Sequence, residues 1–251
     1  MAKAEFDPSH YRHAGLLAHS PDGAALCFLE YCHRGQAEFG DALHPDITLD
    51  YIAMGRSMPA WAADDPDSVR RTLAESIGRL AVAGADFFFC PDNTAHIALE
   101  RPGPPLPLPG LNIAGIVAAE AEAQQFGKIG ILGTRFTMTG PVYPRALGAL
   151  GLAHAVPGAG DRAEIDRIIF EELVAGELKD RSRETYLNVI RKLKDSGCDA
   201  VALVCTEIPL LITPEVSPLP TLNSTKLLAL AAYETAMGRA PLPNWRGGPL
   251  D

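Results

Sequence analysis

Two residues that can take up and release protons, Asp92 and Cys205, occupy matching places in two similar stretches of the 251-residue chain. Residues before them pair at a constant separation of 113 positions. The pairs are Ile77 with Ile190, Leu80 with Leu193, Gly84 with Gly197, Asp86 with Asp199, and Asp92 with Cys205. Several positions in register without a gap indicate an internal repeat rather than a chance likeness of two helix–glycine–strand units. A carboxyl and a thiol at matching places are candidates for acid–base chemistry.

The elements that would position these two residues alternate between strands and helices. Short apolar runs predict strands at residues 14–18, 47–53, 87–91, 113–116, 128–132 and 200–204. Apolar residues at helical spacing predict a helix before the third and the last of these strands. A further match, residues 15–19 with residues 130–134, has a separation of 115. We therefore expect an α/β fold with two similar lobes, mainly parallel sheets and pseudo-two-fold symmetry.

The repeat also predicts the domain organisation. We expect an N-terminal lobe at residues 1–110, a second lobe at residues 111–219, and a return to the first lobe at about 220–251. Because ligands bind beyond the carboxyl ends of parallel strands, Asp92 and Cys205 would face one cleft between the lobes. The proline-rich stretch 101–110 cannot form a helix or a central strand, and we expect a surface connection there.

Composition excludes several classes of function. A formal net charge of −9 without a basic run opposes a nucleic-acid partner. No signal peptide and no uncharged apolar stretch of roughly 20 residues is present, so we expect a cytoplasmic protein without a membrane partner. Five cysteines with no Cys-x-x-Cys pair argue against a disulfide framework or a structural zinc site, and we expect no metal.

Two motifs resemble those of the aspartate/glutamate racemase family. Residues 91–96 read Pro-Asp-Asn-Thr-Ala-His, where that family has Pro-Cys-Asn-Thr-Ala-His. Residues 204–210 read Val-Cys-Thr-Glu-Ile-Pro-Leu, which is similar to the family's Gly-Cys-Thr-Glu-[Ile/Leu]-Pro-Leu. The resemblance extends from about residue 15 to residue 236. The family includes pyridoxal-phosphate-independent amino acid racemases, with relatives such as hydantoin racemase, maleate isomerase and arylmalonate decarboxylase.

The resemblance implies an isomerase that needs no cofactor or metal and forms a homodimer. Its substrate would be a small amino acid bearing a carboxylate, whose α-proton two groups take and return from opposite faces. We expect Cys205 and Asp92 to be these catalytic groups, since a Cys at a helix N-terminus is readily deprotonated. The expected substrate-binding residues are Asn93, Thr94, Thr134, Thr137, Thr206, Glu207, Ser20 and Arg56.

Asp92 is the main departure from the family pattern. A carboxylate with an ordinary pKa of about 4 is a weaker base than a thiolate with one of about 8.5. Our leading hypothesis is that Asp92 stays protonated and acts as a general acid opposite a Cys205 thiolate. Alternatively, Asp92 anchors substrate or merely caps a helix. The protein would then be a single-cysteine decarboxylase or isomerase, or an inactive ligand-binding relative. Cys90 could replace the missing thiol, although a buried spacer is the usual fate of a free cysteine.

The remaining candidates lie around the expected pocket. His19 and Ser20 stand in a loop where the family has small residues, and His19 could bind substrate or face solvent. Arg56 could hold a distal carboxylate through its two-pronged guanidinium, or be a surface arginine. His96 could be structural or catalytic.

Overall fold

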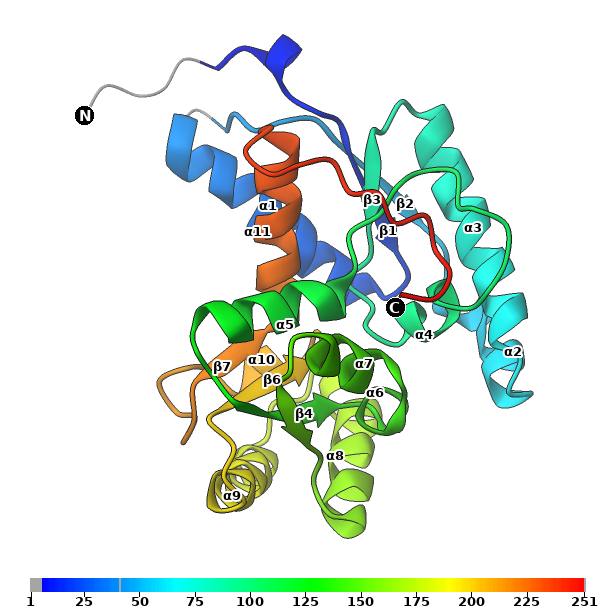
Figure 1. Ribbon diagram of the computed structural model, residues 1–251. Helices are drawn as coiled ribbons and strands as arrows, with labels where there is room; N and C mark the ends of the chain where they lie inside the picture. Colours follow the sequence, from blue (N-terminus) through cyan, green and yellow to red (C-terminus); the bar gives the residue numbers. More distant parts are fainter. Residues whose placement is uncertain (1–5, 41, 251) are drawn as a thin grey trace. The chain divides into compact units, whose positions relative to one another are not determined.

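The chain divides into two compact units in a computed structural model, which describes residues 6–40 and 42–250 (Figure 1). Unit 1 contains the described residues up to Ile113 and those from Leu228 onward. Unit 2 is Ala114–Leu227. Two helices therefore begin at or beside a boundary between the units: α5 (Ile113–Ala123) and α11 (Ser224–Ala236).

Unit 1 is built on a parallel sheet whose strand order is β2-β1-β3. The strands are β1 (Ala14–Ala18), β2 (Ile47–Tyr51) and β3 (Phe87–Phe89). Its helices are α1 (Pro21–Phe39), α2 (Met58–Ala62), α3 (Pro66–Val82) and α4 (Ala95–Leu99), with 3-10 turns η1 (Pro8–His10) and η2 (Met54–Arg56). Every residue of the central strand β1 is buried.

Unit 2 is built on a parallel sheet whose strand order is β5-β4-β6-β7. The strands are β4 (Lys128–Gly133), β5 (Ala153–Ala155), β6 (Ala200–Val204) and β7 (Thr221–Asn223). Besides α5, its helices are α6 (Arg135–Thr139), α7 (Val142–Ala149), α8 (Ala159–Glu171), α9 (Asp180–Asp195) and α10 (Ile208–Leu211), with the 3-10 turn η3 (Leu173–Ala175). Two parallel α/β units confirm the expected fold class.

The two units share the details that the sequence repeat predicts. Gly84 and Gly197 follow α3 and α9 with φ of +90° and +86°, a conformation that favours glycine. The carboxylate of Asp86 accepts a hydrogen bond from the His13 amide at 2.7 Å, and that of Asp199 accepts from the Lys128 amide at 2.8 Å. Both amides lie just before or at the start of the central strand of their unit.

The correspondence continues beyond the strands. An isolated parallel bridge between Phe88 and Gly110 lies beside β3, as β7 lies beside β6. Gly110 permits this approach because a Cβ there would lie 2.2 Å from the Phe88 ring. The helices α5 and α11 then begin at Ile113 and Ser224, 111 residues apart, which is also the separation between Gly110 and Thr221.

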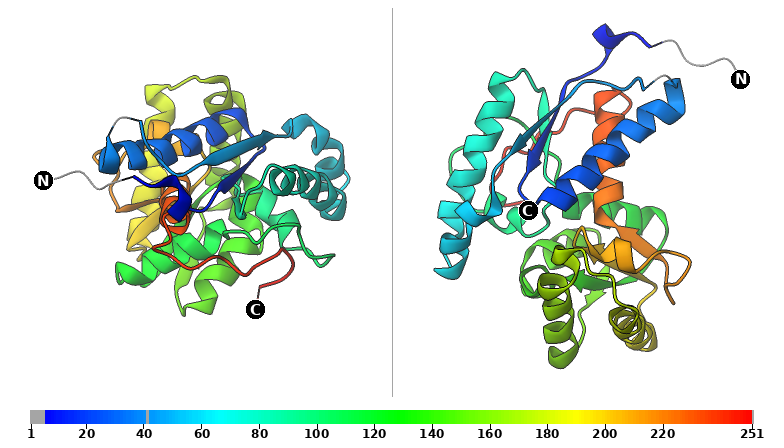
Figure 2. Two further views of the ribbon diagram at one scale, coloured as in Figure 1. Left: turned by 90° about the horizontal axis from the view of Figure 1, so that it is seen from above. Right: turned by 180° about the vertical axis from the view of Figure 1, so that it is seen from behind.

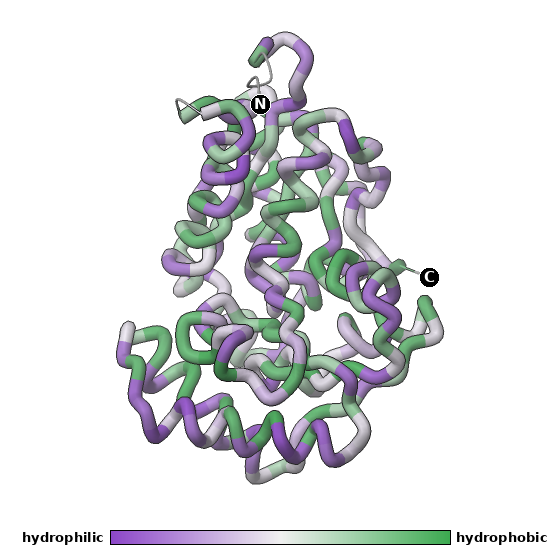
Figure 3. The backbone as a smooth tube through the Cα atoms, turned by 90° about the vertical axis from the view of Figure 1, so that its left-hand side faces the viewer, coloured by the Kyte–Doolittle hydropathy of each residue, from purple (hydrophilic) through white to green (hydrophobic). Residues whose placement is uncertain are grey.

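Local signals account for the long helices. Asp65 caps α3 by accepting a hydrogen bond from the Ser68 amide at 3.0 Å, and Pro66 occupies the first turn. Apolar residues then recur at helical spacing and are fully buried: Val69, Leu73, Ile77 and Leu80. Hydrophobic and hydrophilic bands alternate along the helices in Figure 3. None of the helices in the described ranges has both the length and the apolar content needed to cross a membrane.

One expected strand is wrong. Residues 113–116 begin helix α5, whose buried positions Ile113, Val117 and Ala121 recur every four residues. A short apolar run is compatible with either a strand or a buried helix, and only the longer spacing separates them. Strands β2 and β3 also end two residues earlier than expected, at Tyr51 and Phe89.

Unit 1 is completed by the C-terminal part of the chain, whose red tail runs beside the green 101–110 stretch in Figure 2. Helix α11 packs on α1, with the rings of Tyr233 and Tyr31 5.7 Å apart. The tail then joins the core around β3 through Trp245, whose indole lies 6.1 Å from the Phe88 ring. The segment after residue 227 is therefore part of the core of unit 1.

Candidate active site

Cys205 lies directly after β6, and its thiol has a carboxylate partner. The thiol donates a hydrogen bond to Glu207 Oε2 at 2.9 Å, and the Thr206 hydroxyl donates to the same oxygen at 2.7 Å. Thr206 and Glu207 are buried, whereas Cys205 is partly accessible. Helix α10 begins at Ile208, so these residues form the turn that leads into it, as the motif predicts. A carboxylate that accepts a thiol's hydrogen bond is well placed to receive its proton.

A buried tyrosine adds to this environment. Tyr186, on α9, is fully buried, and its hydroxyl has no hydrogen-bond partner in the described part of the chain. Burial raises the pKa of Tyr186 well above its ordinary value, and the neighbouring Cys205, Glu207 and Asp166 raise it further. Tyr186 therefore stays neutral next to the thiol. The sequence reasoning missed this residue because nothing in its spacing distinguishes it from a core tyrosine.

Two predicted threonines lie at the same edge of unit 2. The strand pair β4–β6 ends with Gly133 beside Val204, so Thr134 and Cys205 are the next residues of neighbouring strands. Thr134 is the N-cap of α6. Its hydroxyl accepts a hydrogen bond from the Thr137 amide at 3.4 Å. A Cβ at Gly133 would lie 2.7 Å from Val204 Cγ2, so glycine lets the two strand ends approach each other.

Asp92 lies in the equivalent place of unit 1, after β3, and it caps the following turn. Its Oδ1 accepts hydrogen bonds from the amides of Thr94 at 2.9 Å and Ala95 at 3.3 Å. The other oxygen, Oδ2, receives no hydrogen bond from the described residues. Asn93 is buried, with its side-chain amide 3.4 Å from the Pro91 carbonyl. One oxygen of Asp92 therefore holds the turn, which leaves the other unpaired in the described part of the chain.

The turn that carries Asp92 rests on the C-terminal tail. His96 Nε2 lies 3.1 Å from the Cys90 carbonyl oxygen, and its ring stacks on Trp245 with centroids 6.0 Å apart. The Trp245 carbonyl accepts a hydrogen bond from the Gly110 amide at 2.7 Å, and the Gly248 amide donates to the Leu99 carbonyl at 2.9 Å. His96 is thus an internal support of the turn.

Cys90 is a buried thiol. It is fully buried in the core of unit 1, and burial together with the nearby Asp92 raises its pKa well above the ordinary value. This environment supports the interpretation of Cys90 as a buried spacer.

The loop after β1 differs from the sequence expectation. His19 is 1% exposed rather than solvent-facing, and its Nε2 lies 3.0 Å from the Ser57 hydroxyl. Ser20 follows it as the residue before α1 and makes no side-chain capping bond. Ser57 is not predictable as the partner of His19, because no sequence pattern connects two residues that are 38 positions apart.

Arg56 is held by a surface ion pair. Its guanidinium lies 2.8 Å from Glu75 Oε2 on α3, and both side chains are about half exposed, at 52% and 51%. Unlike the other predicted residues of unit 1, it stands on η2 rather than directly after a strand. The ion pair would have to open before Arg56 could hold a substrate carboxylate.

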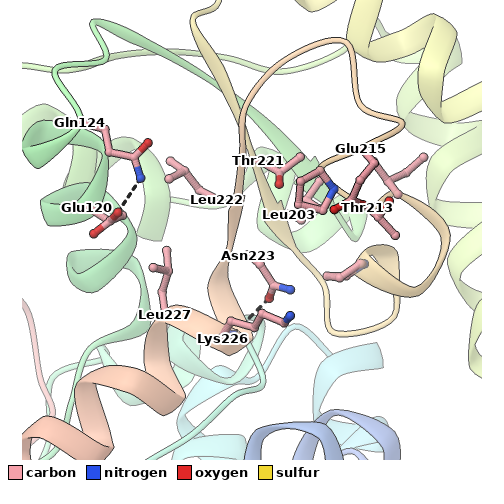
Figure 4. Close-up of a pocket in the computed structure, with 13 residues that line it drawn as sticks. Glu120, Gln124, Leu203, Thr213, Glu215, Thr221, Leu222, Asn223, Lys226 and Leu227 are labelled. Atoms are coloured by element: carbon pink, nitrogen blue, oxygen red, sulfur yellow. Dashed lines mark hydrogen bonds between the residues drawn. The ribbon is translucent and has the colours of Figure 1, made fainter. Parts of the chain in front are cut away.

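A pocket of about 440 Å³ lies elsewhere on unit 2, between β7, α10 and α5 (Figure 4). Its polar lining includes Thr221, Asn223, Lys226 and Glu215, and its lining does not include Cys205 or Glu207. The thiol therefore does not belong to this pocket. Within the described ranges, no three His, Cys, Asp or Glu side chains gather as a metal site requires.

Comparison with known proteins gives one consistent result. The model of the Asp/Glu/Hydantoin racemase family matches residues 23–232. A glutamate racemase from Roseiflexus sp. (strain RS-1) is 27% identical over 180 residues, which are 68% of this chain and 61% of that protein.

Solved structures agree with this result. A Yersinia pestis protein provisionally assigned as an Asp/Glu racemase is 28% identical, with a TM-score of 0.80 over 90% of this chain and 99% of that one. An aspartate racemase homologue from Pyrococcus horikoshii OT3 shares the fold at 24% identity, with a TM-score of 0.74 over 90% and 99% of the two chains.

Proposed function

Because this chain belongs to the Asp/Glu/Hydantoin racemase family, we propose that it racemises a small carboxylate-bearing amino acid without a cofactor. Cys205 and Asp92 are the proposed acid–base groups. The observation that carries the proposal is the 2.9 Å hydrogen bond from the Cys205 thiol to Glu207, at the carboxyl end of a parallel strand. Ligands of parallel α/β sheets bind at such ends.

The thiol would act as the base on one face of the substrate. Glu207 takes the thiol proton, and the resulting thiolate removes the α-proton, so the C–H bond breaks and an S–H bond forms. The carbanion that remains is stabilised by hydrogen-bond donors around the substrate carboxylate. We assign Thr134, Thr137, Thr206, Asn93, Thr94 and Ser20 to substrate binding, with Arg56 as a further candidate for a distal carboxylate.

Asp92 would return a proton on the other face. Its Oδ1 accepts from two amides, which the carbonyl oxygen of a protonated carboxyl can also do, while Oδ2 could carry the proton. Transfer of that proton to the carbanion completes the inversion and leaves Asp92 ionised. In the reverse direction Asp92 removes the proton and Cys205 returns it.

The cap at Asp92 also supports a second candidate. If Asp92 does no more than hold the turn, Cys205 alone would supply or remove protons, as in a single-cysteine isomerase or decarboxylase. An inactive ligand-binding protein is the corresponding alternative without catalysis.

The test is α-proton exchange in D2O, followed by NMR, with each enantiomer of aspartate and glutamate. The matched variants are Cys205→Ser, Cys198→Ser as its control, and Asp92→Asn, which keeps a capping oxygen but cannot transfer a proton. We expect inversion with exchange in the wild type and in Cys198→Ser, and its loss in the other two. Inversion that survives Asp92→Asn would contradict the role of Asp92, and exchange without inversion would favour the one-base reaction.

Assembly and location are further proposals. On the resemblance and the composition we propose a cytoplasmic homodimer with no nucleic-acid or membrane partner. Light scattering coupled to gel filtration measures the mass directly, and a monomer at micromolar concentration would contradict the dimer.

A further inference from the structure

His19 carries a buried nitrogen atom with no partner. The side chain is 1% exposed at the end of β1, and its Nε2 lies 3.0 Å from the Ser57 hydroxyl. The other ring nitrogen, Nδ1, has no hydrogen-bond partner among the residues that the structure describes. Buried polar atoms are nearly always hydrogen-bonded, so an unpaired one indicates either a cost in stability or a missing ligand.

The strand register of unit 1 aligns His19 with Asp92. Strands β1 and β3 pair with a separation of 73 residues, as Ala14 with Phe87 and Leu16 with Phe89. The last pair is Leu16 with Phe89, and the same separation carried three residues further aligns His19 with Asp92, since 19 plus 73 is 92. Ser57 follows β2, which lies on the opposite side of β1. His19 thus follows the central strand, which lies between the strand that leads to Ser57 and the strand that leads to Asp92.

The repeat gives this position a counterpart in unit 2. The match of residues 15–19 with residues 130–134 pairs His19 with Thr134. Thr134 follows the central strand β4, and the β4–β6 register places it beside Cys205. In each unit a polar residue thus follows the central strand, at the register position of the proposed acid–base group.

We propose that His19 Nδ1 donates a hydrogen bond to the carboxylate of the substrate. The inference rests on the proposed function, which it deepens by naming a binding group. The proposal assigns the ring proton to Nδ1, so that the Ser57 hydroxyl donates to Nε2. Of the two side chains at this edge, Asp92 offers mainly acceptor oxygens and His19 offers an N–H. A substrate carboxylate needs the N–H, which also offsets its repulsion from Asp92 in the direction in which Asp92 is the ionised base.

Two amide variants separate the functions of the two ring nitrogens. The side-chain nitrogen of Asn lies about where Nδ1 lies, whereas that of Gln reaches about as far as Nε2. His19→Asn therefore keeps a donor at Nδ1 and loses the Ser57 contact. His19→Gln keeps a partner for Ser57 and loses the donor at Nδ1. Neither amide can transfer a proton.

The experiment measures binding and catalysis separately. Calorimetry gives the Kd of wild type and both variants for each enantiomer of aspartate and glutamate, and NMR in D2O gives kcat and KM for exchange. For the acid that the wild type binds, we expect His19→Gln to weaken binding on the order of 10- to 100-fold, since the lost hydrogen bond is to a charged group. We expect His19→Asn to bind within about threefold of wild type, and kcat to change little in either variant.

Three results would overturn the proposal. An unchanged Kd in His19→Gln would mean that Nδ1 does not bind substrate. Weaker binding in His19→Asn alone would assign His19 a structural role through Ser57. Loss of exchange for one enantiomer in both variants, with Kd unchanged, would make His19 a proton-transfer group instead. If the wild type binds an acid but does not exchange it, the racemase proposal fails while the Kd values still test His19. Binding of none of the four acids would contradict both.

Discussion

The hydrogen bond between Cys205 and Glu207 joins a partly accessible thiol to a buried carboxylate. Such a contact orients the sulfur and provides a nearby acceptor for its proton. Glutamine at position 207 would keep the volume and an acceptor oxygen, but it cannot take the proton. A Glu207→Gln variant can thus separate the transfer of the thiol proton from the positioning of the sulfur.

We expect Glu207→Gln to lower kcat/KM for α-proton exchange on the order of 10²- to 10⁴-fold, the usual contribution of a general base. NMR-detected exchange in D2O measures the effect. Glu184→Gln, which changes an exposed carboxylate that pairs with Arg191 on α9, is the control and should be unaffected. A Glu207→Gln variant with wild-type exchange would show that the thiol needs no acceptor.

Cys90 gives the opposite prediction. Because its thiol is fully buried and its pKa is raised, we expect Cys90→Ala to keep activity within about threefold while losing about 1 kcal/mol of unfolding free energy. A thiol-labelling reagent should modify Cys205 before Cys90 in the native wild type. A folded Cys90→Ala variant that is strongly inactivated would contradict this prediction and indicate that Cys90 takes part in catalysis.

At the level of single residues, the sequence predicted positions better than roles. The motifs located Cys205 and Asp92, because strand ends and repeat spacing are local patterns. The partners of His19 and His96 come from elements far away in the sequence, namely Ser57 and Trp245. No local pattern specifies those contacts, so burial and hydrogen bonding could be established only from the structure.

Among the elements, the turns that begin the two central strands are held by matching aspartates. Asp199 Oδ2 accepts from the amides of Gly127 and Lys128, both at 2.8 Å, whereas Asp86 Oδ2 accepts from the His13 amide at 2.7 Å. The number of hydrogen bonds therefore differs between the two units, although the positions correspond.

We expect Asp199→Ala to cost about 2 kcal/mol of unfolding free energy and Asp86→Ala about 1 kcal/mol, at about 1 kcal/mol for each hydrogen bond. Urea denaturation followed by circular dichroism measures both. Asp195→Ala, an exposed change at the end of α9, is the control and should cost less than about 0.5 kcal/mol. Equal losses of unfolding free energy in the two variants would contradict the prediction that the loss follows the number of hydrogen bonds.

Trp245 links the tail to the turn that carries Asp92. We expect Trp245→Leu to lower the free energy of unfolding by about 2 kcal/mol. This is less than the loss for a buried aromatic replaced by alanine, because leucine keeps part of the apolar contact. Amide hydrogen exchange should quicken at residues 92–99 and 106–110, which the tail contacts, and stay unchanged in unit 2. Leu242→Ala, at a residue 43% exposed, is the control. Unchanged exchange at residues 92–99 would contradict the supporting role of the tail.

Element prediction succeeded where the sequence pattern was long and failed where it was short. The strands at Ala14–Ala18 and Ala200–Val204 have the predicted bounds, and α3 and α9 follow their apolar spacing. The strands β5 and β7 have three residues each, which is too few for a periodic signal. The start of α5 was taken for a strand because four apolar residues fit either structure.

The whole molecule is made of two units, of which one is a continuous stretch of chain and the other consists of two stretches. Helix α5 follows the last bridge of unit 1, yet Ala114 and the residues after it belong to unit 2. Helix α11 follows the last strand of unit 2, yet Leu228 and the residues after it belong to unit 1. Unit 2 is thus a single stretch of chain, whereas unit 1 needs two.

This division predicts how fragments behave. We expect residues 114–227 expressed alone to give a dispersed amide NMR spectrum. Residues 1–113 alone should not, because Tyr233 and Trp245 are absent from their core. Mixing residues 1–113 with a peptide of residues 224–251 should restore dispersion. A well-dispersed spectrum of residues 1–113 alone would show that α11 and the tail are dispensable.

The same division sets an order of events on the ribosome. Residues 1–113 emerge first, but the helix and the tryptophan that complete their core emerge only after unit 2 has been synthesised. At about 5–20 residues per second, synthesis of residues 114–245 takes roughly 7–26 s. During that time the first-made sheet is uncovered beside α1 and over Phe88, whereas unit 2 has all its residues as soon as its own synthesis ends. The half of the protein that is begun first is therefore finished last, and we expect the nascent chain to be most prone to aggregation during this interval.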